Sequence, residues 1–293
     1  MPQCPLCNNL NTSTVKHKKI KNLWSCSHCL LFFVWPQPSD SELINIYNVR
    51  YFKNQGLSNI GYKDYQKDKE IILKTFNRRF KTIEKIIPEP GKVLDLGCAT
   101  GFFLEILENK GWDVYGIDIS EFAVKVAREK FRGKILNNVI ENSNFPENYF
   151  DLITMWDYLE HVPSPKRAIA ICKKILKPKG FLILTTPDLS SLMAKMTGER
   201  WMGYKDEEHL FYFSKQALKD LLLQHDFIIR KMRYAGKYIS IDLFIERLHF
   251  YSPLLSRVIS KLIKIFNLSK WSEKHSIYIN PFDIVEIIAQ KQN

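Results

Sequence analysis

A short apolar run that closes in a glycine-containing turn is the first stretch of the sequence with recognisable chemistry. It reads VLDLGCATG and places a carboxylate before two glycines, as Asp95-x-Gly97-x-x-x-Gly101. A phosphate-binding loop would end in Gly-Lys-Ser/Thr, whereas Phe102 follows the last glycine here, so the turn excludes ATP hydrolysis. A dinucleotide site is also disfavoured, because the carboxylate of Asp95 repels a pyrophosphate but attracts an ammonium group.

A second carboxylate indicates what this turn holds. The next apolar run ends in Asp118, which is placed to accept hydrogen bonds from both hydroxyl groups of a ribose. A ligand with a ribose, an ammonium group and no phosphate is S-adenosylmethionine, and we expect this cofactor. Ala99 stands in the middle of the turn, where a third glycine is usual, and we interpret it as a tolerated variant.

The cysteines of the first 29 residues form a separate pattern. They make two Cys-x-x-Cys knuckles, which consist of Cys4, Cys7, Cys26 and Cys29. This spacing is typical of a zinc ribbon, in which four thiolates complete a structural tetrahedral site. Disulfides are the alternative, and a reducing cytoplasm disfavours them. The sequence therefore predicts structural Zn²⁺ near the N-terminus.

Alternating strands and helices are expected to position these residues. A long amphipathic helix at 67–87 precedes apolar strands at 93–96, 113–117, 134–136, 150–155 and 181–185, with helices between them. This rhythm predicts an α/β fold whose parallel sheet is covered by helices on both faces. Segments 227–234 and 283–289 are expected to form a closing strand pair.

Composition divides the chain into three parts. Residues 1–35 form the predicted zinc ribbon, 36–90 an aromatic linker with a lid helix, and 91–293 the cofactor-binding domain with a helical insertion at 240–280. The aromatic residues of segment 47–65 are expected either to fold over the cofactor or to pack the ribbon against the main domain.

Four stretches, in this order, resemble the motifs of class I S-adenosylmethionine-dependent methyltransferases. They are VLDLGCATGFFLEILENKGWDVYGIDIS, FDLITMWDYLEHV, ILKPKGFLILTTPD and EEHLFYFS. The resemblance covers nearly the whole chain outside 240–280. It is closest to bacterial enzymes that carry an N-terminal zinc ribbon and occur in glycan and lipid-linked saccharide pathways. It implies a Rossmann-like class I methyltransferase sheet plus a small zinc ribbon.

The resemblance also implies which residues hold the cofactor. Asp95 and the glycine turn hold the methionine end, Asp118 holds the ribose, and the segments around Glu141 and Trp156 flank the adenine and the methyl group. The full expected set is Asp95, Gly97, Cys98, Gly101, Asp118, Ile119, Glu141 and Trp156.

Two histidines in predicted loops are candidates for acid–base catalysis. Methyl transfer to a hydroxyl group releases a proton, so a base near neutral pH is useful. His209 in DEEHLFYFS is the preferred base, with a structural role as the alternative. His161 in LEHVPSP is the second candidate, and a hydrogen bond that fixes its loop is the alternative for this residue.

Segment 250–270 sorts basic and apolar side chains into a helical pattern. Helix 253–267 would carry an apolar face flanked by Arg257, Lys261 and Lys264. A cationic amphipathic helix suits the surface of an anionic membrane, and packing on its own domain or on a second subunit is the alternative. The rest of the net charge of +12 is dispersed along the chain.

No apolar run reaches the roughly 20 residues that span a bilayer, and the N-terminus does not resemble a secretory signal. We therefore expect a cytoplasmic location, with the inner face of the membrane as an option, and the oligomeric state stays open.

The sequence leaves three acceptor classes. The leading hypothesis is O-methylation of a sugar hydroxyl in a surface glycan or its precursor, and the alternatives are RNA and a quinone-like small molecule. Nucleic acid is the less expected partner, because Met155-Trp-Asp-Tyr158 lacks the Asn/Asp-Pro-Pro-aromatic tetrad of amino-group methyltransferases. The basic residues also form no stripe interleaved with aromatic residues.

Overall fold

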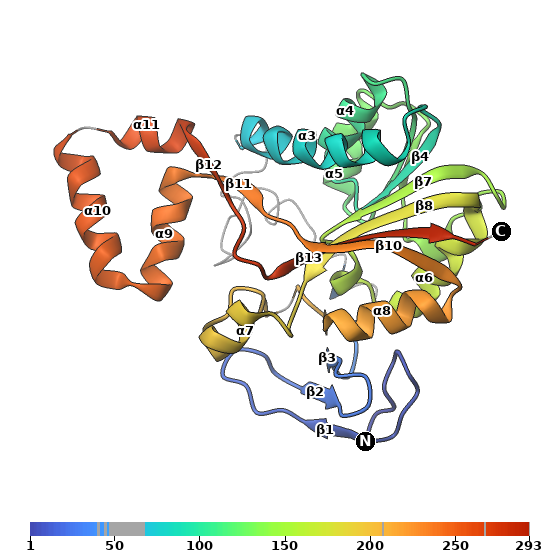
Figure 1. Cartoon of the computed structure of the whole chain (residues 1–293), viewed down its shortest axis with the longest axis horizontal. Coiled ribbons are helices and arrows are strands. Elements are labelled where there is room, and N and C mark those ends of the chain that lie inside the picture. The colour runs from blue at the N-terminus through green and yellow to red at the C-terminus, as the bar shows by residue number, and fades with distance from the viewer. Residues whose placement is uncertain (40–41, 44–45, 47–67, 207, 267, 293) are drawn as a thin grey trace.

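A mixed seven-stranded sheet forms the centre of the structure (Figure 1). The computed structural model describes residues 1–39, 42–43, 46, 68–206, 208–266 and 268–292. In their order across the sheet, the strands are β10 (Phe227–Tyr234), β13 (Ile284–Lys291), β8 (Leu176–Pro187), β7 (Phe150–Trp156), β4 (Lys92–Leu96), β5 (Asp113–Asp118) and β6 (Ile135–Asn137). Strands β8, β7, β4, β5 and β6 are parallel, whereas β13 is antiparallel to both β8 and β10.

The predicted α/β fold class is confirmed, and so is the closing strand pair. The sheet is mixed because this pair, β10 and β13, joins the parallel strands at β8. Strand β8 is longer than the predicted segment 181–185, since its first residues already pair with β7.

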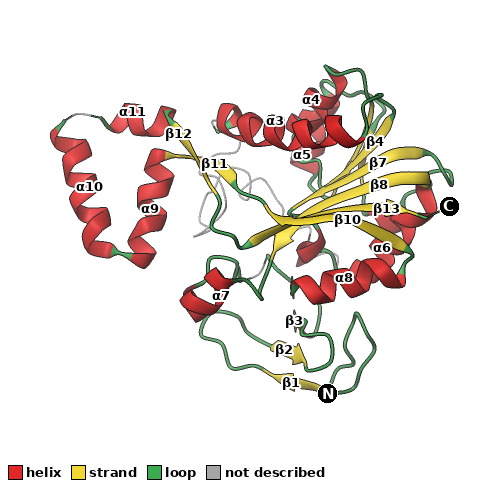
Figure 2. Cartoon of the chain, viewed as in Figure 1, coloured by secondary structure: helices red, strands yellow, loops and turns green. Residues whose placement is uncertain are grey.

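Helices cover both faces of the sheet, as Figure 2 shows. One face carries α3 (Lys69–Ile86), α4 (Phe102–Glu108) and α5 (Glu121–Arg128), and the other carries α6 (Pro165–Ile175) and α8 (Lys215–Gln224). Local sequence determines where two of them start, because the hydroxyl oxygens of Ser120 and Ser214 accept hydrogen bonds from the amides of Ala123 and Ala217.

The N-terminal segment forms a small antiparallel sheet with a strand from the main domain. Strands β1 (Thr12–Thr14), β2 (Leu23–Cys26) and β3 (Phe32–Val34) are joined by β9 (Phe211–Tyr212), which pairs with β3. Leu31 and Phe33 are fully buried and belong to the same core cluster as α6 and α8. Contacts with the main domain therefore stabilise this segment, in addition to any metal at its cysteines.

A helical insertion follows β10. Its elements are β11 (Lys237–Ser240), α9 (Ile241–Tyr251), α10 (Pro253–Ile265), α11 (Ser269–Lys274) and β12 (Ser276–Ile279), and β11 pairs with β12. Figure 1 shows these helices to one side of the sheet, with α10 outermost. Helix α10 falls within the predicted helix 253–267. None of the described helices is long and apolar enough to cross a lipid bilayer.

Two short segments connect the sheet to the ribbon and to the candidate site. The first comprises α7 (Leu192–Thr197) and the 3₁₀ turn η3 (Gly198–Arg200). The second is the 3₁₀ turn η2 (Leu159–His161), which follows β7 and lines the candidate site, and another 3₁₀ turn, η1 (Ile140–Asn142), precedes β7. The predicted aromatic lid at 47–65 lies outside the described residues.

Candidate active site

The carboxyl ends of β4, β5 and β7 open into a cavity of about 550 Å³. Ligands of open α/β sheets bind at this edge, outside the carboxyl ends of the strands. Apolar side chains make up much of the wall, including Phe76 of α3, Met193 of α7, and Phe244 and Leu248 of α9. The cavity is large enough for a nucleoside-sized cofactor and a small acceptor.

Backbone conformation explains the glycines after β4. Gly97 has φ of +73°, and a Cβ atom there would lie 2.8 Å from Cδ2 of Tyr158. Gly101 caps α4 with φ of +84°, and a Cβ atom there would lie 2.8 Å from Cε2 of Phe131. Ala99 also has a positive φ, of 47°, which explains why glycine is usual at this position.

Two carboxylates flank the turn in different environments. Asp118 lines the cavity, and its two oxygens accept hydrogen bonds from the amides of Ala99, at 2.8 Å, and Ser120, at 2.9 Å. Asp95 is buried behind the turn, where it accepts a 2.6 Å hydrogen bond from the hydroxyl of Thr154. Burial raises the pKa of Asp95 to about 7. A cationic ligand group close to Asp95 would favour its charged form.

Arg79 is a residue that the motifs did not indicate. It lies on the buried face of α3, with its guanidinium carbon 4.6 Å from the ring centroid of Trp156, and both side chains line the cavity. Its Nε has no hydrogen-bond partner among the described residues. The sequence does contain one signal for it, because an arginine on the apolar side of an amphipathic helix is buried, and a buried charge requires a partner.

Asp157 and Lys237 extend this charged region along the cavity wall. Burial works against the charged form of Asp157, but the nearby charges of Arg79 and Lys237 outweigh it and lower the pKa of this carboxyl. Burial and the nearby charge of Arg247 lower the pKa of Lys237 to about 8. These cations come from α3, β11 and α9, and no spacing in the sequence relates them.

The structure brings His161 and His209 together with Glu160. The two imidazole centroids are 4.8 Å apart, and one ligating atom of each of the three residues lies within 4.8 Å of the others. Nδ1 of His161 is 2.8 Å from the carbonyl oxygen of Glu208, and Nδ1 of His209 is 2.9 Å from that of Gly203. Each Nδ1 therefore carries the proton, which leaves Nε2 as the basic atom of each neutral ring.

Glu160 gives this cluster its unusual electrostatics. The side chain is buried, and neither carboxyl oxygen has a hydrogen-bond partner in the described part of the chain. Burial and the neighbouring charge of Asp157 raise the pKa of Glu160 to about 8. Burial lowers the pKa of His209 well below its ordinary value, and that of His161 is also lowered. An uncharged cluster of potential proton donors and acceptors thus faces the cavity.

The predicted site residues separate into two groups. Those that line the cavity are Gly97, Asp118, Ile119, Trp156, His161 and His209. The remaining four, Asp95, Cys98, Gly101 and Glu141, are not among its lining residues. Their roles stay predictions.

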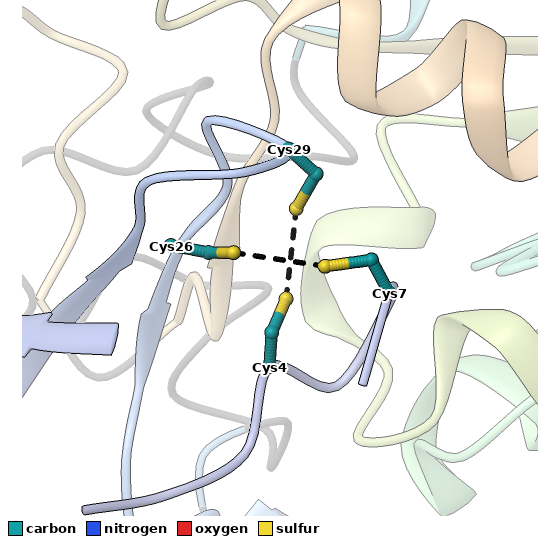
Figure 3. Close-up of side chains that lie close together, drawn as sticks. All are labelled: Cys4, Cys7, Cys26 and Cys29. Carbon is teal, nitrogen blue, oxygen red and sulfur yellow. Dashed lines mark hydrogen bonds between the residues drawn. The ribbon is translucent and has the colours of Figure 1, made fainter. Parts of the chain in front are cut away.

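The four N-terminal cysteines converge on one point (Figure 3). The sulfur atoms of Cys4 and Cys29 are 3.5 Å apart and those of Cys7 and Cys26 are 3.6 Å apart, so no disulfide links them. A tetrahedral site with Zn–S bonds of about 2.3 Å requires sulfur atoms about 3.8 Å apart. The donor set and its spacing therefore fit zinc, and the cluster lies outside the cavity-lining residues.

The sequence is similar to ubiquinone biosynthesis O-methyltransferases over 37% of its length. It is 40% identical over 114 residues to the ubiquinone biosynthesis O-methyltransferase of Coxiella burnetii, covering 37% of this chain and 49% of the relative. It is 36% identical over 118 residues to the enzyme of the same name from Thiobacillus denitrificans, covering 37% and 50%. The chain spans about half the length of these relatives.

Solved structures share the fold. An S-adenosylmethionine-dependent methyltransferase from Archaeoglobus fulgidus matches with a TM-score of 0.51 at 18% identity, over 78% of this chain and 99% of that one. One from Thermotoga maritima matches with a TM-score of 0.50 at 18% identity, over 78% and 95%. The predicted Rossmann-like methyltransferase fold is confirmed. A family model described as methyltransferase domain matches residues 65–231, more than half of the sequence, and the chain belongs to this family.

Proposed function

We propose that this chain is an S-adenosylmethionine-dependent O-methyltransferase that acts on a phenolic hydroxyl of a quinol-like small molecule. The observation that supports the reaction best is the cavity at the carboxyl ends of β4, β5 and β7, whose wall includes both Asp118 and the cluster of Glu160, His161 and His209. The acceptor class is supported by the names of the relatives, which are ubiquinone biosynthesis O-methyltransferases.

The residues at the strand ends fit the cofactor. Asp118 would accept the ribose hydroxyls, Asp95 lies behind the turn that would hold the methionine end, and the buried Arg79 would meet the carboxylate of that end. When bound, S-adenosylmethionine supplies an electrophilic methyl group. The protein contributes mainly orientation, because methyl transfer needs the acceptor oxygen, the methyl carbon and the sulfur in line.

The cavity wall favours a phenolic acceptor over the glycan acceptor that we expected from the sequence. Phe76, Val162, Met193, Phe244 and Leu248 line it, whereas a saccharide site needs many hydrogen-bonding groups at fixed positions. A planar apolar ring gains more from such a wall than a polyhydroxylated ring does. The RNA alternative has less support, since the cations of the candidate site, Arg79, Lys237 and Arg247, face a cavity of limited volume rather than an open surface.

His209 is the proposed base. Its Nδ1–H donates to the carbonyl oxygen of Gly203, which leaves Nε2 to accept the phenolic proton. The neighbouring Glu160 carboxyl would be favoured in its charged form once an imidazolium forms beside it. His161 is held by the carbonyl oxygen of Glu208, and we assign it to positioning the cluster.

We also propose that Cys4, Cys7, Cys26 and Cys29 hold one structural Zn²⁺. With four protein ligands the metal has no open position, so it would fix the ribbon rather than take part in the reaction.

Methyl-labelled S-adenosylmethionine tests the acceptor assignment. We expect the label to pass to a catechol that carries an alkyl chain, and His209→Ala to slow this transfer about 100-fold or more at saturating acceptor. Incubation with whole-cell glycan and RNA fractions provides the comparison. Label in the glycan fraction and none in the catechol would refute the assignment of a phenolic acceptor. Full turnover by His209→Ala would refute the assignment of His209 as the base.

A further inference from the structure

Helix α10 exposes an apolar stripe to solvent. Leu254, Leu255, Val258, Leu262, Ile265 and Phe266 are each between 48% and 76% exposed. Four of them, at 254, 258, 262 and 266, are spaced by four residues and therefore lie on one side of the helix. Single exposed apolar residues are common on protein surfaces, but a continuous stripe along a whole helix indicates a binding surface.

A basic stripe runs beside the apolar one. Arg257, Lys261 and Lys264 are exposed and spaced by four and three residues, so they form an adjacent row on the same helix. Helix α10 contains no acidic residue. The outer surface of α10 is thus apolar along its middle and cationic along one flank.

The inner side of the same helix is fixed to the protein. Ser256 is buried, and its hydroxyl donates a 2.9 Å hydrogen bond to the carbonyl oxygen of Ile245 in α9. Ile259 and Ile263 are half-buried. The apolar face predicted for helix 253–267 is therefore divided, because Ile259 and Ile263 turn inward whereas the other apolar residues stay exposed.

We propose that α10 docks on the surface of an anionic lipid bilayer. An apolar stripe with a cationic flank fits acyl chains and anionic headgroups at the same time. A two-fold contact with a second copy in which the two α10 helices run antiparallel fits less well, because it would bring the basic row of one helix against that of the other. Helix α10 lies at the outer edge of the insertion, where a flat surface can approach it (Figure 1).

Docking would also bring the cavity close to the bilayer. Phe244, Arg247 and Leu248 of α9 line it, and α9 packs directly against α10. Only the thickness of this helix pair then separates the bilayer from the cavity wall. The consequence, that a lipid-dissolved acceptor reaches the cavity from the membrane, rests on the proposed function. The docking itself does not, and it is measured without turnover.

Co-sedimentation with vesicles tests the docking directly. The full chain is mixed with vesicles of phosphatidylcholine alone or with 30 mol% phosphatidylglycerol (about one anionic lipid in three), and we expect binding to the anionic vesicles. Arg257→Gln/Lys261→Gln/Lys264→Gln should weaken binding about 100-fold, because each basic side chain contributes about 5-fold. Leu254→Ser/Val258→Ser/Leu262→Ser should weaken it by a similar factor.

Matched controls separate docking from general effects. Lys81→Gln/Lys85→Gln/Lys125→Gln removes three exposed charges elsewhere, and Leu10→Ser/Leu30→Ser removes two exposed apolar side chains from the ribbon. Both controls should bind vesicles like the wild type, and circular dichroism checks that every variant is folded.

A second measurement follows the insertion itself. Trp271 of α11 is 45% exposed, and its fluorescence should shift to shorter wavelength with anionic vesicles, a shift that Trp271→Phe removes without loss of binding. The proposal is overturned if the wild type does not sediment with anionic vesicles or if the two α10 variants bind as the wild type does. It is also overturned if the wild type is a dimer in solution that the serine variant converts to a monomer while neither binds vesicles.

Discussion

Replacing Gly97 by alanine should lower the free energy of unfolding. A control substitution at Gly133 separates the backbone contribution to this loss from the steric one. Gly97 and Gly133 have nearly the same backbone angle, with φ of +73° and +74°. A Cβ atom at Gly133 would meet nothing within 4 Å, whereas at Gly97 it would lie 2.8 Å from Cδ2 of Tyr158. Gly133→Ala therefore reports the backbone cost alone, and Gly97→Ala adds the steric conflict.

The magnitudes follow from these two terms. A left-handed conformation costs an alanine about 1–2 kcal/mol, so Gly133→Ala should lower the free energy of unfolding by this amount. Crowding inside a packed region costs about 1–3 kcal/mol more, so Gly97→Ala should lose about 2–5 kcal/mol in total. Denaturant unfolding monitored by circular dichroism measures both variants. Equal losses at the two positions would refute the steric reasoning, because the backbone term would then account for the whole effect.

Three further predictions concern the charged groups and the metal. Arg79→Met should weaken S-adenosylmethionine binding about 10- to 100-fold in calorimetry, and an unchanged Kd would contradict its role at the carboxylate. Cys7→Ser should abolish the content of about one zinc ion per chain, measured by elemental analysis, and a full zinc content would contradict the four-cysteine site. Burial raises the pKa of Glu160 from 4.5 to about 8, so the stability that its protonated form contributes is complete below about pH 4.5 and is lost as the pH rises through 8. Glu160→Gln removes this loss, so its stability relative to the wild type should increase between these pH values, and a constant difference would contradict the raised pKa.

Local signals explain what the sequence predicted well. The caps at Ser120 and Ser214 act within one turn of their helices, and the apolar strands are short runs with their own periodicity. The turn at Gly97 and Gly101 is equally local, because the backbone angles of the two glycines form it. Ala99 shows where this local reasoning stopped, since its positive φ and the hydrogen bond that its backbone N–H donates to the Asp118 carboxylate are visible only in the structure.

Tertiary contacts explain what the sequence did not predict. Strand β9 pairs with β3 and completes the ribbon sheet, although the two strands lie far apart in the sequence. No motif in either segment predicts this pairing. Arg79 meets Trp156 in the same way, from a helix that precedes the glycine turn. The proximity of Glu160 to the two histidines depends on the loop that carries His209, and the sequence indicated the histidines but not the carboxyl group near them.

Binding of S-adenosylmethionine, measured by isothermal titration calorimetry, tests the proposed cofactor site most directly. Strand β5 carries an aspartate at each end, and only Asp118 lines the cavity, whereas Asp113 pairs with Lys92 and Lys134. We expect the wild type and Asp113→Asn to bind the cofactor alike and Asp118→Asn to bind it about 10- to 100-fold more weakly. No binding by the wild type, or equal binding by the two variants, would contradict the assignment of the cavity.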